Sequence, residues 1–355
     1  MNNGIKILGA GLICVDIVRN NDSTKIMNGG SCANVVSVLS QIGYDCCVIR
    51  EQYSGSFESF LSTTLASLGV KESFYNHSHA NAPRIIENLS DYEHRFYTTC
   101  PHCGKKILSL KLPSIADIQA IEDQLADIDV FYCDRASSGI RYLMNGIEMR
   151  NGISIYEPNS ARNLKGLIAT AAMADILKFS KDRIPESVAE RIRSECKKAK
   201  LIISTDGAKG LSFSHRTDSG EMSPWITLPS VFNGPVIDTS GAGDWLTAGF
   251  LAELLRDRES ISLKSLLDEK EISRMLNMGM KYSQLCCAAI GAQGVFYSPK
   301  YSKELQKLTV FGEKLKYIHL DSQSVTEKDT CPLCFSELPG GSYTATLQKD
   351  EDAAV

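Results

Sequence analysis

Short apolar runs rich in β-branched residues alternate with segments of helical period from the amino terminus to about residue 295. This alternation is typical of an α/β layered fold around a largely parallel sheet, because each buried strand needs a helix to cover it. The expected strands are Ile5–Leu8, Cys47–Ile49, Ile128–Cys133, Ile153–Tyr156, Ile176–Lys178, Leu201–Thr205 and Gly210–Ser214. The expected helices are Ala33–Gln41, Phe57–Leu68, Ile115–Leu125, Ile140–Met149, Pro185–Ala199, Ala242–Leu255 and Ile272–Ala289.

Residues 71–99 break this rhythm, because Arg84–Glu87 and His94–Thr98 form extended patterns joined by a polar turn at Ser90-Asp91. We therefore expect a small β-structured lid at about residues 71–112, within a main domain of residues 1–310. A carboxy-terminal segment follows at 311–338. Residues 339–355 are small, polar and charged, which predicts a disordered tail.

Charge and hydropathy limit the partners of this 355-residue chain. Its net charge of −4 provides no basic surface to neutralise a nucleic-acid backbone, so a small-molecule substrate is expected instead. The amino terminus lacks a basic stretch followed by an apolar run, and no segment reaches the roughly 18 apolar residues of a membrane span. The expected location is therefore cytoplasmic, with no membrane partner.

One glycine-rich segment, Asp238-Thr-Ser-Gly-Ala-Gly-Asp244, lies at the start of the expected helix Ala242–Leu255. The N–H groups at a helix start and the helix dipole favour an anion, and glycines let a phosphate approach the backbone closely. A carboxylate in the first turn, that of Asp244, would stand beside an attacking hydroxyl and can take its proton. The segment indicates a phosphoryl-transfer site; a helix cap followed by a glycine turn is the simpler alternative.

The whole string followed by an apolar helix resembles the signature of the ribokinase-like sugar kinases, also called the PfkB carbohydrate kinase family. The resemblance extends from about Ile5 to about Tyr297. It implies a three-layer ribokinase-like fold with a mostly parallel central sheet, flanking helices and a small β-lid. It also implies ATP and Mg²⁺ as cofactors and Asp244 as general base. The amides of the anion hole would be those of Gly241, Ala242 and Gly243.

Two motifs nearer the amino terminus are similar to the family's acceptor-binding elements. Gly9-Ala-Gly-Leu-Ile-Cys-Val-Asp16 resembles the first strand and the substrate-binding aspartate; a dinucleotide fingerprint is the alternative, but its third glycine is missing. Asn28-Gly-Gly-Ser-Cys-Ala-Asn34 is similar to the Gly-Gly-x-x-x-Asn element, in which the asparagine bonds substrate hydroxyls. The acceptor-binding residues implied here are Asp16, Gly29, Gly30 and Asn34.

Later segments resemble the family's nucleotide-binding elements. Thr205-Asp-Gly-Ala-Lys-Gly210 resembles a turn between two late strands that contacts the nucleotide phosphates, which implies contacts from Thr205, Gly207 and Gly210. The region Ala288–Gly294 is compared with the segment beside adenine. Together with Asp238, that segment would help to bind a monovalent cation such as K⁺.

The segment Tyr156-Glu-Pro-Asn-Ser-Ala-Arg162 is similar to a family substrate segment, with glutamate in the first place and the arginine displaced. It implies acceptor contacts from Asn159 and Arg162. The guanidinium of Arg162 suits a substrate oxyanion or phosphate, and it can equally cap a helix that begins near Asn163.

A larger departure follows at Ser180-Lys-Asp-Arg183. Ser180 fits the family's Ser-x-x-Glu element beside the nucleotide, but Arg183 stands where a magnesium-supporting glutamate is usual. Either Asp182 takes that role, or Arg183 contacts phosphate directly, or the chain has weak or no turnover.

Among twelve cysteines, Cys100-Pro-His-Cys103 and Cys331-Pro-Leu-Cys334 each have the shape of a zinc knuckle. Four thiolates bind tetrahedral Zn²⁺, whereas a redox Cys-x-x-Cys needs only one pair and usually opens a helix. Cys331 stands 228 positions after Cys103, so only the fold can bring the pairs together. We predict a structural zinc site that clips the carboxy-terminal segment to the lid. The other eight cysteines are interpreted as core residues.

These features lead to two hypotheses of different classes. The first is an ATP-dependent kinase of a sugar, sugar acid or nucleoside, with a sugar or sugar derivative favoured. The second is a kinase-fold protein that has lost turnover and binds a nucleotide or sugar as a sensor or partner module. Family lids often pair, so a homodimer through the lid is a further expectation, unless the zinc clip replaces that contact.

Overall fold

The predicted alternation builds a nine-stranded sheet in the computed structural model, which describes residues 4–19, 24–90, 93–125, 127–256, 268–308, 317–319 and 346–348. The strand order is β13-β12-β11-β10-β9-β8-β1-β4-β5. The bounds are β1 Lys6–Ala10, β4 Asp45–Ser54, β5 Lys71–Asn81, β8 Val130–Cys133, β9 Ile153–Tyr156, β10 Ile176–Ser180, β11 Leu201–Thr205, β12 Gly210–His215 and β13 Ile226–Pro229. Neighbouring strands are parallel from β5 across to β11, and β12 and β13 add antiparallel at one edge.

The carboxyl ends of the parallel strands define where a ligand can bind. The strand order reverses between β1 and β8, because β1 pairs with β4 on one side and β8 on the other. Ligands of open parallel sheets bind outside the carboxyl ends near such a point. The strands β9, β10 and β11 end on this edge at Tyr156, Ser180 and Thr205. Polar residues that follow these strands are therefore gathered along one edge.

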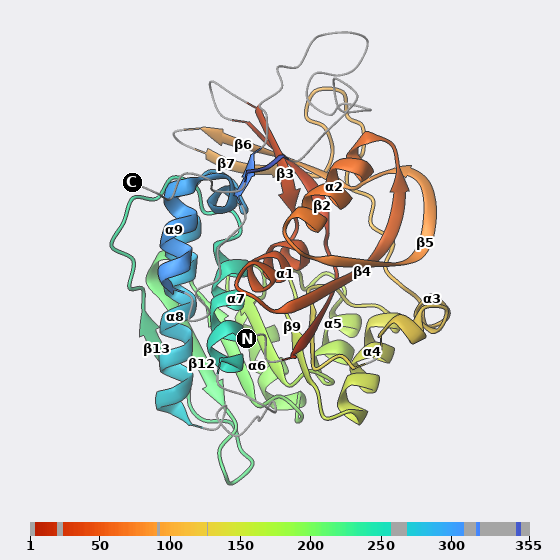
Figure 1. Ribbon diagram of the computed structural model, residues 1–355. Coiled ribbons are helices and arrows are strands. Elements are labelled where there is room, and N and C mark those ends of the chain that lie inside the picture. Colours follow the sequence, from red (N-terminus) through yellow and green to blue (C-terminus); the bar gives the residue numbers. More distant parts are fainter. Residues whose placement is uncertain are drawn as a thin grey trace.

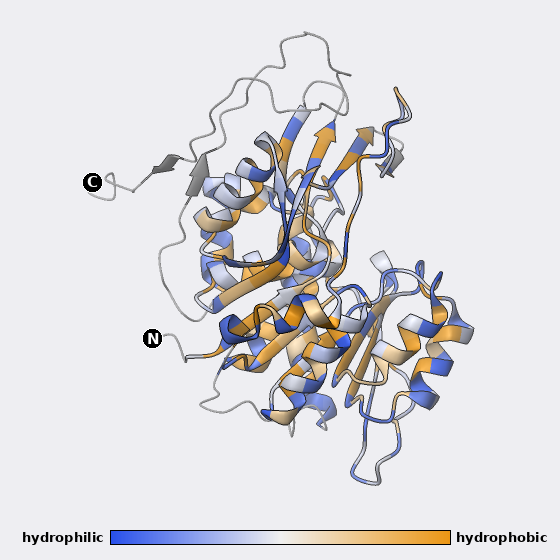
Figure 2. Ribbon diagram, turned by 90° about the vertical axis from the view of Figure 1, so that its right-hand side faces the viewer, coloured by the Kyte–Doolittle hydropathy of each residue, from blue (hydrophilic) through white to orange (hydrophobic). Residues whose placement is uncertain are grey.

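Helices cover both faces of the sheet, because alternate side chains of a buried strand point to opposite faces. Ile7 and Leu8 of β1 are fully buried and belong to two separate cores, where each such side chain contributes about 1.5–3 kcal/mol. One core contains α1 Ser31–Gln41, α2 Ser56–Ser67, α7 Ala242–Leu255, α8 Glu269–Cys287 and α9 Pro299–Leu308. The other contains α3 Ile115–Gln119, the 3₁₀ turn Glu122–Leu125, α4 Ser138–Met149, α5 Leu164–Ala171 and α6 Glu186–Glu195. Figure 2 shows apolar residues along the strands and on the inner sides of the helices. The predicted three-layer α/β fold is confirmed.

Helix α7 is buried from Asp244 through Leu255 and packs against α1 and α8. A helix that is buried on all sides is apolar nearly all round. Its aromatic residues Trp245 and Phe250 are at most 2% exposed. Gly249 allows α8 to approach closely, since a Cβ there would lie 2.6 Å from the ring of Tyr282. Asp244 is thus a carboxylate at the start of an otherwise mostly apolar helix.

A four-stranded second sheet, of order β3-β2-β6-β7 among the described residues, lies at the top of Figure 1. Its bounds are β2 Cys14–Arg19, β3 Thr24–Gly29, β6 Arg84–Ser90 and β7 Glu93–Tyr97. The expected small β-structured lid is present, but its composition differs from the prediction. Residues 14–29 supply two of its strands, and residues 71–81 pair with β4 in the main sheet. Two short strands, β14 Tyr317–His319 and β15 Thr346–Gln348, pair with each other.

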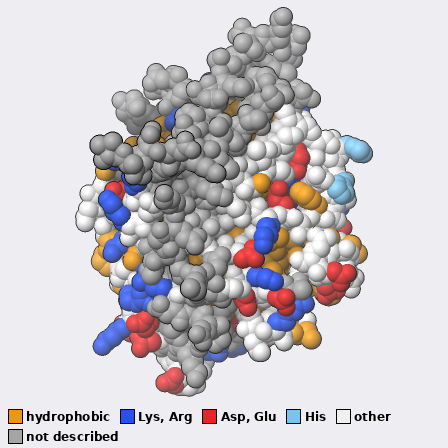
Figure 3. Space-filling model, in the orientation of Figure 1, with side chains coloured by type: hydrophobic (Ala, Val, Ile, Leu, Met, Phe, Trp, Pro, Cys, Tyr) orange, Lys and Arg blue, Asp and Glu red, His pale blue; other side chains and the backbone are white. Residues whose placement is uncertain are grey.

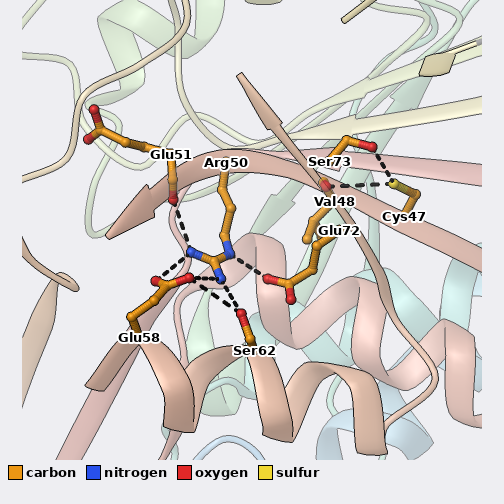
Figure 4. Close-up of polar contacts among 8 residues, drawn as sticks. All are labelled: Cys47, Val48, Arg50, Glu51, Glu58, Ser62, Glu72 and Ser73. Carbon is orange, nitrogen blue, oxygen red and sulfur yellow. Dashed lines mark hydrogen bonds and ion pairs between the residues drawn. The ribbon is translucent and has the colours of Figure 1, made fainter. Parts of the chain in front are cut away.

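A buried ion-pair cluster joins β4, α2 and β5 (Figure 4). The guanidinium of Arg50 is 4% exposed and contacts both carboxylate oxygens of Glu58 at 2.6 and 2.8 Å. It also contacts Glu72 at 2.5 Å and the Ser62 hydroxyl at 2.8 Å. Every nitrogen of the guanidinium has a partner, so the cluster satisfies the buried positive charge.

The face of the molecule in Figure 3 has basic and acidic side chains lying beside each other. In the part of the chain that the structure describes, no helix is long and apolar enough to cross a membrane. Most of residues 309–355, including the second cysteine pair and nearly all of the expected tail, lies outside the described residues.

Candidate functional site

A cavity of about 640 Å³ lies at the carboxyl ends of β9, β10 and β11, next to the start of α7. Ten of the residues that the sequence motifs singled out line it. These are Asn159, Ser180, Arg183, Thr205, Gly207, Gly210, Gly241, Ala242, Gly243 and Asp244. The lid contributes Phe96, which is 52% exposed. Segments predicted separately from sequence therefore meet in one pocket large enough for a nucleotide and a small acceptor.

Glycines shape the start of α7 as the phosphate interpretation requires. Gly241 has φ 73, and a Cβ there would lie 2.4 Å from the Cβ of Ala292, so only glycine fits without strain. The first i→i−4 bond of the helix is donated by the Trp245 amide, at 2.9 Å from Gly241 O. The amides of Gly243 and Asp244 precede that bond, whereas the Ala242 amide donates to Thr239 O at 3.2 Å. The helix start therefore presents backbone donors to the cavity.

Asp244 lies beside these amides and is 8% exposed. One carboxylate oxygen accepts a hydrogen bond of 2.7 Å from Asn34 Nδ2, which fixes its orientation. Burial, followed by the charge of Glu157, raises the pKa of Asp244 to about 6, against the lowering effects of Asn34 and Lys178. A carboxylate with a pKa near the working pH is suited to general-base chemistry.

The predicted acceptor-binding residues lie in strands β2 and β3 of the lid and at the start of α1. Asp16 is in β2, and its carboxylate rests on Gly29 at the end of β3, because a Cβ on Gly29 would lie 1.8 Å from Asp16 Oδ2. Gly30 is the N-cap of α1, and Asn34 one turn later contacts Asp244. Burial, and next the charge of Glu87 on β6, raises the pKa of Asp16 well above its ordinary value. Asp16, Gly29, Gly30 and Asn34 are themselves buried rather than exposed to the cavity.

The predicted nucleotide-binding turn follows β11. Gly207 has φ 50, and no atom lies within 4 Å of the position of a Cβ, so the turn is open there. Gly210 has φ 106 and packs against β13, where a Cβ would lie 2.2 Å from Leu228 O. Arg183 and Asp182, at the end of β10, are both exposed and line the cavity. The arginine is therefore next to the pocket that would hold the phosphates.

Arg162 is exposed and is not among the residues that line the cavity. Its proposed role as a helix cap is filled by its neighbour, because Asn163 Oδ1 accepts from the Gly166 amide at 3.0 Å at the start of α5.

Asp238 joins two loops next to the site. Its carboxylate oxygens accept from the amides of Ser240 at 2.8 Å and Gly291 at 2.6 Å. Its expected role in binding a monovalent cation stays a prediction.

The zinc hypothesis also stays a prediction. Cys100 is buried and Cys103 exposed, in a turn closed by the bonds Cys100 N to Lys105 O and Gly104 N to Cys100 O. Cys331 and Cys334 lie outside the described residues. Within the described part, no group of three or more His, Cys, Asp or Glu side chains could hold a metal ion.

The sequence predicts no role for Lys178 and gives Glu157 only as the first residue of a substrate-like segment, but the two form an ion pair at the cavity. Lys178 lies within the apolar strand β10, in the sequence Ile-Leu-Lys-Phe-Ser, and its side chain is only 3% exposed. A lysine inside a buried strand is a signal that could have marked it as functional, because lysines are rarely buried without a specific partner.

Comparisons with known proteins agree with the fold. The model of the pfkB family carbohydrate kinases matches residues 154–298, less than half of the chain but including the Asp238–Asp244 segment. A fructokinase with bound ATP from Xylella fastidiosa superposes with a TM-score of 0.66 at 18% identity, covering 87% of this chain and 98% of its own.

Two further structures give similar values. A ribokinase from Giardia lamblia has a TM-score of 0.65 at 15% identity, covering 81% of this chain and 94% of its own. An adenosine kinase from Schistosoma mansoni in complex with 2-fluoroadenosine has a TM-score of 0.65 at 14% identity, covering 82% and 97%. No curated protein matches the chain. At these identities the structural matches establish the ribokinase-like fold.

Proposed function

We propose that this chain is a pfkB-family kinase that transfers the γ-phosphoryl group of ATP to a hydroxyl of a sugar or sugar derivative. The observation that supports this most is the placement of Asp244. A buried carboxylate with a raised pKa is held by Asn34 beside the backbone donors of a glycine-rich helix start. Base and anion site are therefore adjacent, as phosphoryl transfer requires.

In this proposal the acceptor oxygen attacks the γ-phosphorus as the bond to the β–γ bridging oxygen breaks. Asp244 takes the hydroxyl proton, and ADP leaves. The amides at the start of α7 would stabilise charge that develops on the transferred group. Thr205, Gly207, Gly210 and Ser180 would bind the nucleotide, and the lid would exclude water from the reaction.

The acceptor side of the site favours a neutral molecule. Asp16 and Glu87 are both buried, and burial, followed by the charge of Glu87, raises the pKa of Asp16. A further negative charge placed beside these two carboxyl groups would be repelled, so a sugar acid is disfavoured there. We therefore favour a sugar over a sugar acid.

Mg²⁺ fits the acids that line the cavity. This ion binds one or two carboxylates together with substrate phosphates and keeps several waters. Glu157 is paired with Lys178, so Asp182, exposed at the end of β10, is the better candidate to support Mg²⁺. Held by Asp182, the ion would supply positive charge that offsets part of the charge on the phosphates.

ADP formation over a panel of sugars and nucleosides, with wild type and Asp244→Asn, tests the proposal. We expect activity on at least one sugar and a loss of about 10²–10⁴-fold in the variant. Asp218→Asn, on an exposed loop after β12, is the matched control and should keep full activity. Equal activity of Asp244→Asn and wild type would overturn the assignment of the base.

Arg183 favours a second candidate, a nucleotide- or sugar-binding module without turnover. Its cation lines the cavity where the resemblance places a glutamate. Nucleotide binding by a wild-type protein that forms no ADP with any acceptor would support this function over the first.

A further inference from the structure

The amine of Lys178 lies at the first turn of α7. Lys178 is part of β10, lines the cavity and is 3% exposed. A Cβ built on Gly243 would lie 3.5 Å from its Nζ atom. A buried cation therefore stands directly beside the glycine that precedes the candidate base.

Glu157 holds this lysine in a fixed position. One carboxylate oxygen forms the ion pair with Lys178 Nζ. The other lies 3.2 Å from the hydroxyl of Tyr132 and 2.9 Å from that of Thr247. Thr247 is one turn beyond Gly243 on α7, so β9, β10 and α7 are joined at this point. Such an arrangement orients the amine without using all three of its N–H groups.

The charges around this pair call for a cation if a phosphoryl group is to bind. The carboxylates of Asp244, Glu157 and Asp134 would repel that group, whereas the amine of Lys178, which lowers the pKa of Asp244, attracts it. Burying a lysine–glutamate pair is costly, and an apolar pair of similar volume is often at least as stable. The pair therefore has a better explanation in function than in stability.

We propose that Lys178 is a further catalytic residue that binds the transferring phosphoryl group, with Glu157 as its positioning residue. This inference rests on the proposed kinase function. When ATP is bound, the amine donates to a non-bridging oxygen of the γ-phosphate while it keeps its contact with Glu157. It offsets charge on the phosphates beside the carboxylates of Asp244, Glu157 and Asp134. It also keeps Asp244 ionised.

The test compares Lys178→Met with the double variant Lys178→Met/Glu157→Gln, which leaves no buried charge without a partner. Lys198→Met is the control, because Lys198 pairs with Asp175 at 3.5 Å, next to the amino end of the same strand. We expect kcat to fall about 10²–10³-fold in the single and the double variant, with the acceptor KM changed less than about threefold. Lys178→Arg, which keeps the charge, should recover part of kcat.

The pH profile distinguishes a catalytic from a structural role. In Lys178→Met the acidic limb of kcat should move to higher pH, since the amine no longer lowers the pKa of Asp244. A purely structural lysine would lower the amount of folded protein without moving that limb. A folded double variant with wild-type kcat and an unmoved limb would overturn the proposal.

Binding of a non-hydrolysable ATP analogue that keeps a γ-phosphate, measured by calorimetry with Mg²⁺ and with EDTA, separates this proposal from the kinase function. If wild type shows no turnover but Lys178→Met binds the analogue at least about tenfold more weakly, the phosphate-binding role stands and the kinase function fails. If the affinity for the analogue and kcat are both unchanged in Lys178→Met, the lysine has no role in phosphate binding.

Discussion

At the scale of single residues, opposing influences set the pKa of the Asp244 carboxyl group. Burial and Glu157 favour its protonated form, while Asn34 and Lys178 favour the ionised form. A base acts only when it is ionised, so a pKa of about 6 places the change within the range where the protein can be assayed.

The pH dependence follows directly. We expect kcat to rise about tenfold per pH unit below pH 6 and to level off above it, because the fraction of ionised Asp244 follows the same curve. Steady-state kinetics between pH 5 and 8 at saturating substrate measure this. A profile that is flat across pH 6 would contradict the role of Asp244 as base.

Stability should show the opposite trend. The pKa of Asp244 is higher in the folded chain than its ordinary value of 3.8, so the folded state binds the proton more tightly. The stabilising contribution of this proton is present below pH 3.8 and is lost as pH rises through about 6. Asp244→Asn should therefore be at least as stable as wild type at pH 7.5, and this comparison serves as the folding control for the kinetic experiment.

The motif Asp238–Asp244 could be recognised from sequence because its glycines and carboxylate are adjacent in the chain. Lys178 and Glu157 lie 21 residues apart, and their pairing depends on the parallel register of β9 and β10. Such cross-strand contacts are set by tertiary structure. Sequence therefore indicated the base but not the cation beside it.

At the scale of elements, the Arg50 cluster fixes how β4 and β5 extend beyond the main core. Arg50→Leu would leave Glu58 and Glu72 buried without their cation, so we expect a loss of about 3–5 kcal/mol in the free energy of unfolding. Urea unfolding measures the change. Lys71→Ala is the control, since its pair with Asp45 is 69% exposed on the lysine side and should contribute less than about 1 kcal/mol.

Two outcomes decide this prediction. A triple replacement of Arg50, Glu58 and Glu72 by apolar residues should recover most of the lost stability, because no buried charge would remain. If Arg50→Leu costs no more than Lys71→Ala, the cluster does not determine the stability of this edge.

The elements themselves were predictable to different degrees. Buried strands such as β9 and β11 are predicted with their final bounds, because Ile-Ser-Ile-Tyr and Leu-Ile-Ile-Ser-Thr are short runs rich in apolar and β-branched residues. Strand β5, with the sequence Lys-Glu-Ser-Phe-Tyr-Asn-His-Ser-His-Ala-Asn, is polar, and within the described residues it pairs only with β4 at the sheet edge. Residues 71–81 form a strand because they pair with β4, and their hydropathy gives no sign of this pairing. The sequence pattern therefore places them in the lid.

At the scale of the whole molecule, the zinc hypothesis depends on bringing two distant cysteine pairs together. Cys100 and Cys103 lie in a tight turn after β7 at the end of the second sheet. If Cys331 and Cys334 complete a tetrahedral site, the carboxy-terminal segment is tied to the lid. The metal then stabilises the folded state, because the unfolded chain does not hold a preformed site.

We expect about one zinc ion per chain by elemental analysis of the purified protein, with a lower melting temperature after treatment with a strong chelator. Cys331→Ser/Cys334→Ser should lose the metal and show the same drop without chelator. Cys47→Ser is the control, because Cys47 is a half-buried thiol on β4 outside either pair. A zinc content well below one ion per chain, together with an unchanged melting temperature of the double variant, would contradict the zinc hypothesis. The two cysteine pairs would then be independent features, and the lid would be held by its own strand pairing and by its packing on α2.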